Sequence, residues 1–281
     1  MQKEREKLDE RLLSINQVTV IQQWSVTQLI DGVRRHGISA ISIWRDRLKE
    51  CGTAEAARML KGEGLTVTGL CAAGLISTPE PAEATNALDE LKRAIDEAAA
   101  IGASCLIFVA GGIDLRDKNL ASARARVLER LAGIAPHARA AGTRIALEPL
   151  HPMACASRSV LTSMKLANDW CDALGAEDVF GIAVDTYAVW WDPDLPREIA
   201  RAGRRICAFH IADWLADTQD LRLDRGMMGD GVIDIPAIRR MVEATGYTGH
   251  REVEIFSQRN WWKRDPDEVI RVIKERYQTA V

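Results

Sequence analysis

FGIAVDTY, at residues 180–187, is a short apolar run that ends in a carboxylate, Asp185. A run of this length and composition is typical of a strand that is buried on both faces of a sheet. A similar design occurs in RIALEPL (144–150), RICAFHIAD (205–213) and REVEIF (251–256). Buried strands of this kind predict a parallel sheet whose faces are covered by other elements.

Four more short apolar runs precede these, and amphipathic segments with helical spacing separate all of them. The earlier strand candidates are LSINQVTV (13–20), AISIW (40–44), TVTGLCAA (66–73) and CLIFVAG (105–111). The first helix is predicted in SVTQLIDGVRRHG (25–37), with Ser25 as its N-cap, and the second in 53–64, with Thr53 as its N-cap. The remaining helices are predicted over 81–102 and about 119–142, and from near Val160, Leu195, Ile235 and Asp265.

Eight strand-and-helix units predict a (β/α)₈ TIM barrel, an α/β fold in which residues 1–281 form a single domain. A doubly wound open sheet is the alternative. That fold often binds its ligand through a glycine-rich first loop, and the segment after the first strand, IQQWSV (21–26), contains no glycine. The barrel is therefore favoured.

The composition excludes several classes of function. The 47% hydrophobic and 27% charged residues are ordinary for a globular enzyme, and a net charge of −3 argues against nucleic-acid binding. No apolar stretch approaches the roughly 20 residues that span a membrane. The charged start, MQKEREKLDERLL (1–13), does not resemble a secretory signal, and no cysteine pair has CxxC spacing. We expect a cytoplasmic protein with free thiols.

Four good metal ligands lie near the ends of the last four strand candidates: Glu148, Asp185, His210 and Glu254. Active sites of (β/α)₈ enzymes lie at the carboxyl ends of the strands, so these side chains are expected to meet above the barrel core. A charged side chain in an apolar strand is costly unless it is paired or bound to a metal. Three carboxylates and an imidazole suit Mn²⁺, Mg²⁺, Co²⁺ or Zn²⁺. The alternative is four unrelated polar strand ends, each hydrogen-bonded locally.

Other residues near these ligands are candidates for catalysis or substrate binding. His151 follows Glu148 by three positions and is either a general acid/base or a loop histidine bonded to the backbone. Asp213 is expected to orient His210 or to bind a sugar hydroxyl, and Arg225, in DLRLDRGMMGDG (220–231), to contact the substrate. Seven of the eight tryptophans follow predicted strands at the catalytic face, which predicts a sugar pocket or, alternatively, a subunit interface. The tryptophans chosen as substrate contacts are Trp44, Trp191 and Trp214.

The chain resembles the xylose isomerase-like TIM barrel superfamily, in its sugar isomerase/epimerase branch. The motifs that carry the resemblance are ALEP (146–149), AVDTY (183–187), FHIAD (209–213), VEIF (253–256) and MGDGVIDIPAI (228–238). The resemblance implies one divalent metal held by Glu148, Asp185, His210 and Glu254. It also implies that Glu148 and Glu254 act as opposed acid/base groups, which move a proton next to a carbonyl through a metal-stabilised enediolate. The expected substrate is a small sugar or cyclitol, and the expected assembly is a homo-oligomer.

One position departs from the ketose epimerases of this superfamily. They place a substrate-binding histidine three residues after the aspartate of strand six, where this chain has Ala188. The EPLHP segment (148–152) instead resembles C-glycoside deglycosidases and related lyases that act on 3-keto sugars. In such a β-elimination His151 would be the acid or base, so isomerase and lyase both stay open.

Two functions of other classes are disfavoured by the sequence. The superfamily also contains an apurinic-site endonuclease with more histidine ligands, but this chain has five histidines and an acidic pI. A non-catalytic sugar-binding or partner subunit is the other reading, and it is disfavoured because no ligand position is lost. No basic phosphate-binding signature stands out at strands seven and eight, so an unphosphorylated substrate is expected.

Overall fold

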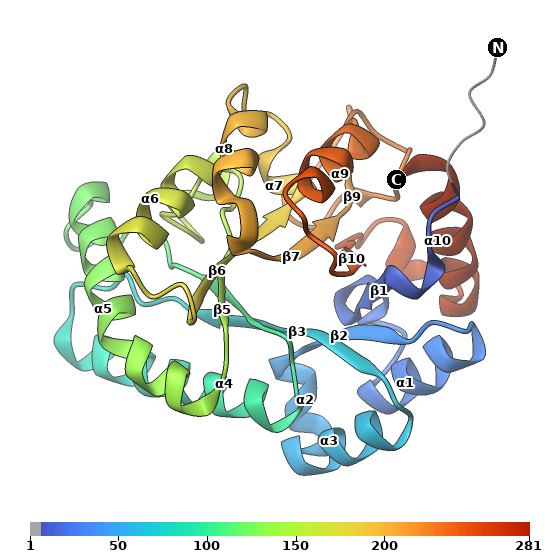
Figure 1. The fold of residues 1–281 in the computed structure, drawn as a ribbon, viewed down its shortest axis with the longest axis horizontal. Helices are drawn as coiled ribbons and strands as arrows, with labels where there is room; N and C mark the ends of the chain where they lie inside the picture. The colour runs from blue at the N-terminus through green and yellow to red at the C-terminus, as the bar shows by residue number, and fades with distance from the viewer. Residues whose placement is uncertain (1–6) are drawn as a thin grey trace.

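Eight parallel strands close into a barrel in the computed structural model, which describes residues 7–281 (Figure 1). The order around the barrel is β1-β10-β7-β6-β5-β4-β3-β2. The strands are β1 (Leu13–Asn16), β2 (Ala40–Trp44), β3 (Thr66–Gly74), β4 (Leu106–Val109), β5 (Ile145–Leu147), β6 (Phe180–Asp185), β7 (Ile206–Ile211) and β10 (Arg251–Val253). The predicted (β/α)₈ fold is therefore confirmed.

Helices surround the barrel because each presents an apolar side to the sheet (Figure 1). They are α1 (Val26–Arg35), α2 (Arg45–Cys51), α3 (Thr53–Gly62), α4 (Pro81–Ala100), α5 (Leu120–Ala141), α6 (Met164–Leu174), α7 (Thr186–Val189), α8 (Leu195–Ala202), α9 (Ile235–Ala244) and α10 (Pro266–Ala280). No helix among residues 7–281 is long and apolar enough to cross a membrane.

Some predicted boundaries were wrong. The first strand ends at Asn16 rather than at residue 20, because the Asn16 side chain accepts the Val18 N–H at 3.0 Å and the chain turns into a 3₁₀ helix, η2 (Gln17–Val20). Gly52, not Thr53, is the N-cap of α3. The helix predicted from near Val160 begins at Met164. Residues 1–6, part of the charged start of the sequence, lie outside the described residues.

A short hairpin interrupts the alternation between β7 and α9. Its strands, β8 (Asp213–Trp214) and β9 (Arg225–Gly226), pair antiparallel to each other and do not join the barrel. The eighth barrel strand is consequently β10. The hairpin projects from the carboxyl end of β7, which is the end where the predicted ligands lie.

Small side chains fill part of the barrel interior. One buried cluster is formed by residues of β3, β4, β5, β6 and β7 or of the start of β4: Cys71, Cys105, Ile107, Ala146, Ala183 and Ala208. All six cysteines of the chain are free, as predicted. Buried polar side chains come from β1, β2, β3 and β10: Ser14, Asn16, Ser42, Thr68 and Glu252.

Candidate metal centre and active site

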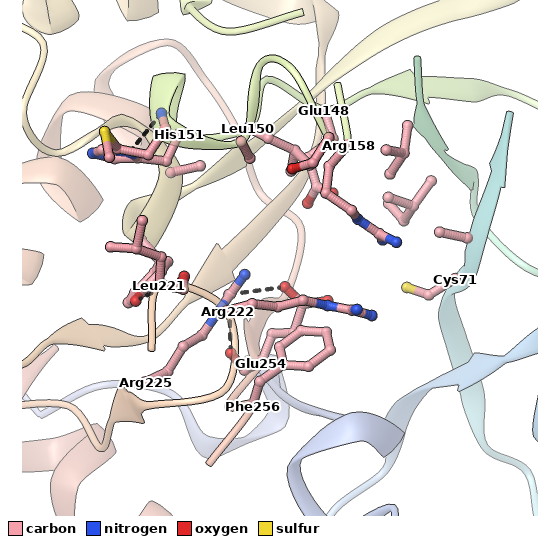
Figure 2. Close-up of a pocket in the computed structure, with 18 of the residues that line it drawn as sticks. Cys71, Glu148, Leu150, His151, Arg158, Leu221, Arg222, Arg225, Glu254 and Phe256 are labelled. Carbon is pink, nitrogen blue, oxygen red and sulfur yellow. Dashed lines mark hydrogen bonds and ion pairs between the residues drawn. The ribbon is translucent and has the colours of Figure 1, made fainter. Parts of the chain in front are cut away.

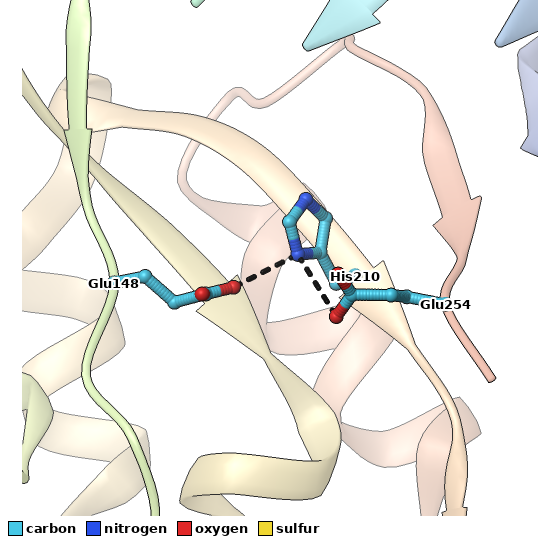
Figure 3. A group of neighbouring side chains, drawn as sticks. All are labelled: Glu148, His210 and Glu254. Carbon is cyan, nitrogen blue, oxygen red and sulfur yellow. Dashed lines mark hydrogen bonds and ion pairs between the residues drawn. The ribbon is translucent and has the colours of Figure 1, made fainter. Parts of the chain in front are cut away.

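Three of the four predicted ligands form one cluster at the carboxyl ends of the strands. Candidate ligand atoms of Glu148, His210 and Glu254 all lie within 4.8 Å of one another. His210 Nδ1 is 2.9 Å from Glu148 Oε1 and 3.6 Å from Glu254 Oε2. The two glutamates approach the imidazole from opposite sides (Figure 3). The three side chains are buried, so they converge without competition from bulk solvent.

The barrel register explains this convergence. Glu148 directly follows β5, Glu254 directly follows β10, and His210 is the second-last residue of β7, the strand paired with β10. Side chains that alternate along a strand point to opposite faces. Each of these residues therefore points into the mouth of the barrel, while its apolar neighbours pack outward against the helices.

Asp185, the fourth predicted ligand, is linked to the cluster through an arginine. It ends β6 in register with His210, and its Oδ2 accepts a hydrogen bond from Arg225 Nη1 at 3.1 Å. The same Arg225 nitrogen donates to Glu254 Oε2 at 3.1 Å. Asp185 is not among the three clustered ligands, so its role as a fourth ligand stays a prediction.

Burial dominates the electrostatics of the cluster. Desolvation raises the pKa of Glu254 to about 8, against the opposing effect of His210 and Arg225. Desolvation also raises the pKa of Asp185, although the Arg225 charge acts the other way. For His210 burial lowers the pKa, but Glu252, Glu254 and Glu148 outweigh it, and the net pKa lies well above the ordinary value. A bound cation would favour the ionised form of these carboxylates.

Glu252 is a buried carboxylate that the sequence reasoning missed. It accepts hydrogen bonds from Asn16 Nδ2 at 2.7 Å, Ser42 Oγ at 2.6 Å and Thr68 Oγ1 at 2.5 Å. Its Oε1 lies 3.4 Å from His210 Nε2, on the side of the ring away from Glu148. The sequence REVEIF contained the signal. Glu252 and Glu254 are two residues apart, and residues at this spacing share one face of a strand.

A cavity of about 390 Å³ opens above the ligand cluster. Glu148 and Glu254 line it together with residues from the loops after several strands (Figure 2). Its volume is within the range of small-molecule sites. The predicted site residues that line it are Glu148, Glu254, His151, Arg225 and Trp44.

His151 has one ring nitrogen already engaged. Its Nδ1 accepts the Met153 N–H at 3.2 Å, and burial lowers its pKa. The neutral ring with Nδ1 as acceptor carries its proton on Nε2. With Nδ1 occupied, Nε2–H is the His151 group left to donate a hydrogen bond.

The three chosen tryptophans differ in their positions. Trp44 lines the cavity, and its Nε1 donates to Asn16 Oδ1 at 2.7 Å. Trp214 and Trp191 do not line the cavity but pack against the His151 ring, with centroid distances of 4.8 and 5.9 Å. Trp191 and Trp214 support the His151 ring. Direct contacts of these two tryptophans with a sugar stay a prediction.

Asp213 holds a loop and does not contact His210. Its two carboxylate oxygens accept the backbone N–H groups of Trp214, Gly229, Gly231 and Ile233 at 2.9–3.0 Å. It is buried and lies outside the cavity lining. A Cβ at Gly231 would lie 2.6 Å from Asp213 Oδ1, so the loop approaches as closely as glycine permits. These hydrogen bonds give Asp213 a role in holding the loop, and its predicted role in orienting His210 or binding a sugar stays a prediction.

The donor set fits a divalent cation. Two carboxylates and an imidazole converge, all buried, and His210 turns Nδ1 to both glutamates and Nε2 to Glu252. An imidazole that ligates through one nitrogen commonly has its other nitrogen facing a carboxylate. Such an ion would be held by Glu148, His210 and Glu254. Asp185 is linked to Glu254 by Arg225, so it remains the candidate for a fourth ligand.

Comparison with known proteins assigns the family. The family model described as xylose isomerase-like TIM barrel matches residues 30–276. The chain belongs to this family. The match covers all barrel strands except β1 and includes every predicted site residue. None of the curated proteins matched the sequence.

Several solved structures resemble this chain over nearly its whole length. A protein of Sinorhizobium meliloti 1021 is 48% identical, with a TM-score of 0.94 and coverage of 97% of this chain and 99% of that one. The IolI protein, solved with a binding zinc atom, is 18% identical, with a TM-score of 0.83 and coverage of 96% and 97%. An L-ribulose 3-epimerase is 21% identical, with a TM-score of 0.77 and coverage of 95% of both chains. At 18% and 21% identity, the likenesses to the IolI protein and to the L-ribulose 3-epimerase show the fold alone.

Proposed function

We propose that this protein is a divalent-metal-dependent isomerase or epimerase of a sugar or cyclitol. The observation that carries the proposal is the pair of carboxylates, Glu148 and Glu254, which flank His210 at the base of a sugar-sized cavity. Moving a proton at a carbon next to a carbonyl requires a base and an acid at that carbon. Two carboxylates on opposite sides of one site meet this requirement.

The two glutamates divide the proton transfer. One removes the proton from the carbon beside the carbonyl, and the other returns a proton to the opposite face, which inverts that centre. Arg225 holds Glu254 and Asp185 in place through its Nη1 hydrogen bonds, and Asn16 Nδ2 donates to Glu254 Oε1 at 3.1 Å. A bound divalent cation would supply Lewis-acid stabilisation of the negative charge that develops on the substrate oxygen.

The structural neighbours support this class of reaction. They include an L-ribulose 3-epimerase, a D-psicose 3-epimerase solved in the presence of D-fructose, and a 3-keto-D-glucoside 4-epimerase from E. coli. Their identities with this chain are 16–21%, so the proposal rests on the carboxylate pair of this chain.

A lyase acting on a 3-keto sugar is the second candidate. It is favoured by two features of the cavity wall: Ala188 leaves space there, and His151 presents Nε2–H. In a β-elimination the same proton abstraction is followed by loss of the group β to the carbonyl, and a donor such as His151 assists its departure.

The test is proton NMR in D₂O with protein loaded in turn with Mn²⁺, Mg²⁺, Co²⁺ or Zn²⁺. The panel contains ketoses, inososes and 3-keto-glucosides. Glu254→Gln, which keeps the side-chain shape and removes the acid/base group, is compared with Glu129→Gln, an exposed glutamate on α5. We expect deuterium at the carbon beside the carbonyl and a new stereoisomer with the wild-type protein and Glu129→Gln, and loss of exchange by at least about 100-fold in Glu254→Gln.

Other outcomes assign the protein differently. Release of an aglycone or of water makes it a lyase, and His151→Asn should then slow the release. Bound metal without exchange on any substrate contradicts both enzymatic proposals and favours a sugar-binding or partner subunit. A homo-oligomer stays a prediction, which light scattering coupled to size-exclusion chromatography measures directly.

A further inference from the structure

Two arginines reach into the cavity from different loops. Arg158 lies between β5 and α6, and Arg222 lies between β8 and β9. Figure 2 shows both guanidinium groups extending to the same end of the cavity, where Cys71 lies. Arg222 lies in the loop after strand seven that the sequence predicts to cover the site, whereas Arg158 was not predicted from sequence to be part of it. The two positive charges are close enough to act on each other: burial lowers the pKa of Arg158, and the charge of Arg222 lowers it further.

These guanidinium groups differ from the third arginine of the cavity. Arg225 pairs through Nη1 with Asp185 and Glu254. Within residues 7–281, neither the Arg158 nor the Arg222 guanidinium lies within ion-pair distance of a carboxylate. Asp220, which also lines the cavity, uses Oδ1 to accept the backbone N–H groups of Arg222 and Leu223 at 2.8 and 2.9 Å.

The loops that carry the pair are anchored. The Arg158 backbone N–H donates to Ala154 O at 2.8 Å, and the adjacent Ser159 is buried and bridged to Gly111. The Arg222 guanidinium lies over the Phe256 ring at 5.9 Å. Guanidinium groups are protonated at every physiological pH. Two unpaired cations in a partly enclosed site repel each other, and an anion between them removes the cost.

We propose that Arg158 and Arg222 form a subsite for an anionic group, so that the substrate is a sugar- or cyclitol-sized carbonyl compound that bears a carboxylate or a phosphate. Planar guanidinium groups bind either anion with paired hydrogen bonds. The same cavity holds Glu148 and Glu254, so an anion at the arginine end leaves the rest of a small ligand at the ligand cluster. An unphosphorylated substrate is expected from sequence because no basic signature stands out at strands seven and eight. In the fold, the single Arg222 after strand seven meets Arg158, which comes from the loop after strand five.

This inference refines the proposed function but is tested by binding, which does not require turnover. Isothermal titration calorimetry compares D-glucose, D-glucuronate and glucose 6-phosphate, which differ in the charge of one group. The protein is used as purified, at low and at high salt. The variant is Arg158→Met/Arg222→Met. Its charge-matched control is Arg240→Met/Arg271→Met, at exposed positions on α9 and α10. The single variant Arg222→Met, at an exposed position, is included in case the double variant does not fold.

We expect at least one anionic ligand to bind about tenfold or more tightly than glucose to the wild-type protein and to the control, with the preference weakened by salt. The preference should disappear in Arg158→Met/Arg222→Met and fall in Arg222→Met. A carboxylate subsite favours glucuronate and a phosphate subsite favours glucose 6-phosphate. Equal binding of charged and neutral ligands overturns the inference. A preference that survives the double substitution also overturns it, because the anion then binds elsewhere. Deuterium exchange on neutral sugars together with equal binding would leave the proposed isomerase intact and remove the subsite alone.

Discussion

At the scale of single residues, Glu252 explains how a histidine inside the barrel is oriented. The hydrogen bonds from Asn16, Ser42 and Thr68 leave its carboxylate little freedom, and its Oε1 faces His210 Nε2. With Nε2 directed to Glu252, Nδ1 is left to face Glu148 and Glu254. A carboxylate behind a ligating imidazole fixes the ring and raises its basicity.

Glu252→Gln should weaken divalent-metal binding by about 10–100-fold. The amide NH₂ would meet side chains that already donate, so the three hydrogen bonds and the contact with His210 cannot all be kept. The measurement is metal affinity by competition with a chelator, with Glu129→Gln as the matched control. Unchanged affinity in Glu252→Gln would show that His210 is oriented by the fold alone.

The pKa of Glu254 predicts how the metal-free protein responds to pH. Its folded value of about 8 lies above the ordinary 4.5, so the folded state holds this proton more tightly than the unfolded state does. The resulting stability is present at low pH and is lost as the pH rises through about 8; the raised pKa values of His210 and Asp185 act in the same direction. The Tm of chelator-treated protein should therefore fall between about pH 6 and 8.5. Glu254→Gln, which does not titrate, should show a shallower fall, and a Tm that rises over this range would contradict the assignment.

At the scale of elements, the loop between β9 and α9 is organised by one carboxylate. Asp213 belongs to β8, and its oxygens accept four backbone N–H groups, three of them from residues 229–233. The paired strand β9 begins with Arg225, whose side chain holds Glu254 and Asp185. The loop anchor and the site are thus joined through one hairpin.

Asp213→Asn should destabilise the fold by about 1–3 kcal/mol, because one acceptor oxygen becomes an NH₂ that opposes backbone N–H groups. Denaturant unfolding measures the loss, and limited proteolysis should detect faster cleavage within residues 229–233. Asp217→Asn, at an exposed position between β8 and β9, is the control and should behave like wild type. Equal stability of the two variants would mean that backbone contacts alone hold the loop.

At the scale of the whole molecule, the ligands come from three different strands of a closed barrel. Glu148 follows β5, His210 is in β7 and Glu254 follows β10. An ion bound by all three joins segments that are more than 100 residues apart in the chain. Such an ion binds the folded state and has no matching site in the unfolded chain.

Metal binding should therefore raise the Tm. At a free concentration 100 times the Kd the gain is about 2.7 kcal/mol, or roughly 5–10 °C for a chain of this size. Differential scanning calorimetry with and without a chelator measures the shift. Glu148→Gln/Glu254→Gln should abolish it, while Glu129→Gln should keep it. A shift of equal size in the double variant would place the ion outside the proposed centre.

Much of this protein follows from local sequence. Periodicity and residue chemistry within a few positions determine the alternation of strands and helices and the helix cap at Ser25. They also place three ligands near strand ends: Glu148, His210 and Glu254. For the same reason the end of β1 was misplaced: the apolar pattern continues past Asn16, and only the hydrogen bond to Val18 N–H stops the strand.

Closure of the barrel decided the rest, because it brings together groups that are remote in sequence. Three contacts of the site each join different strands or loops. Arg225 links Asp185 to Glu254, three donors surround Glu252, and Arg158 meets Arg222 in the cavity. The Asp213 carboxylate could serve as a ligand, but both of its oxygens accept backbone N–H groups of the loop. Which polar side chain finds a partner and which stays free for a ligand depends on distances across the fold, and these exist only once the barrel has closed.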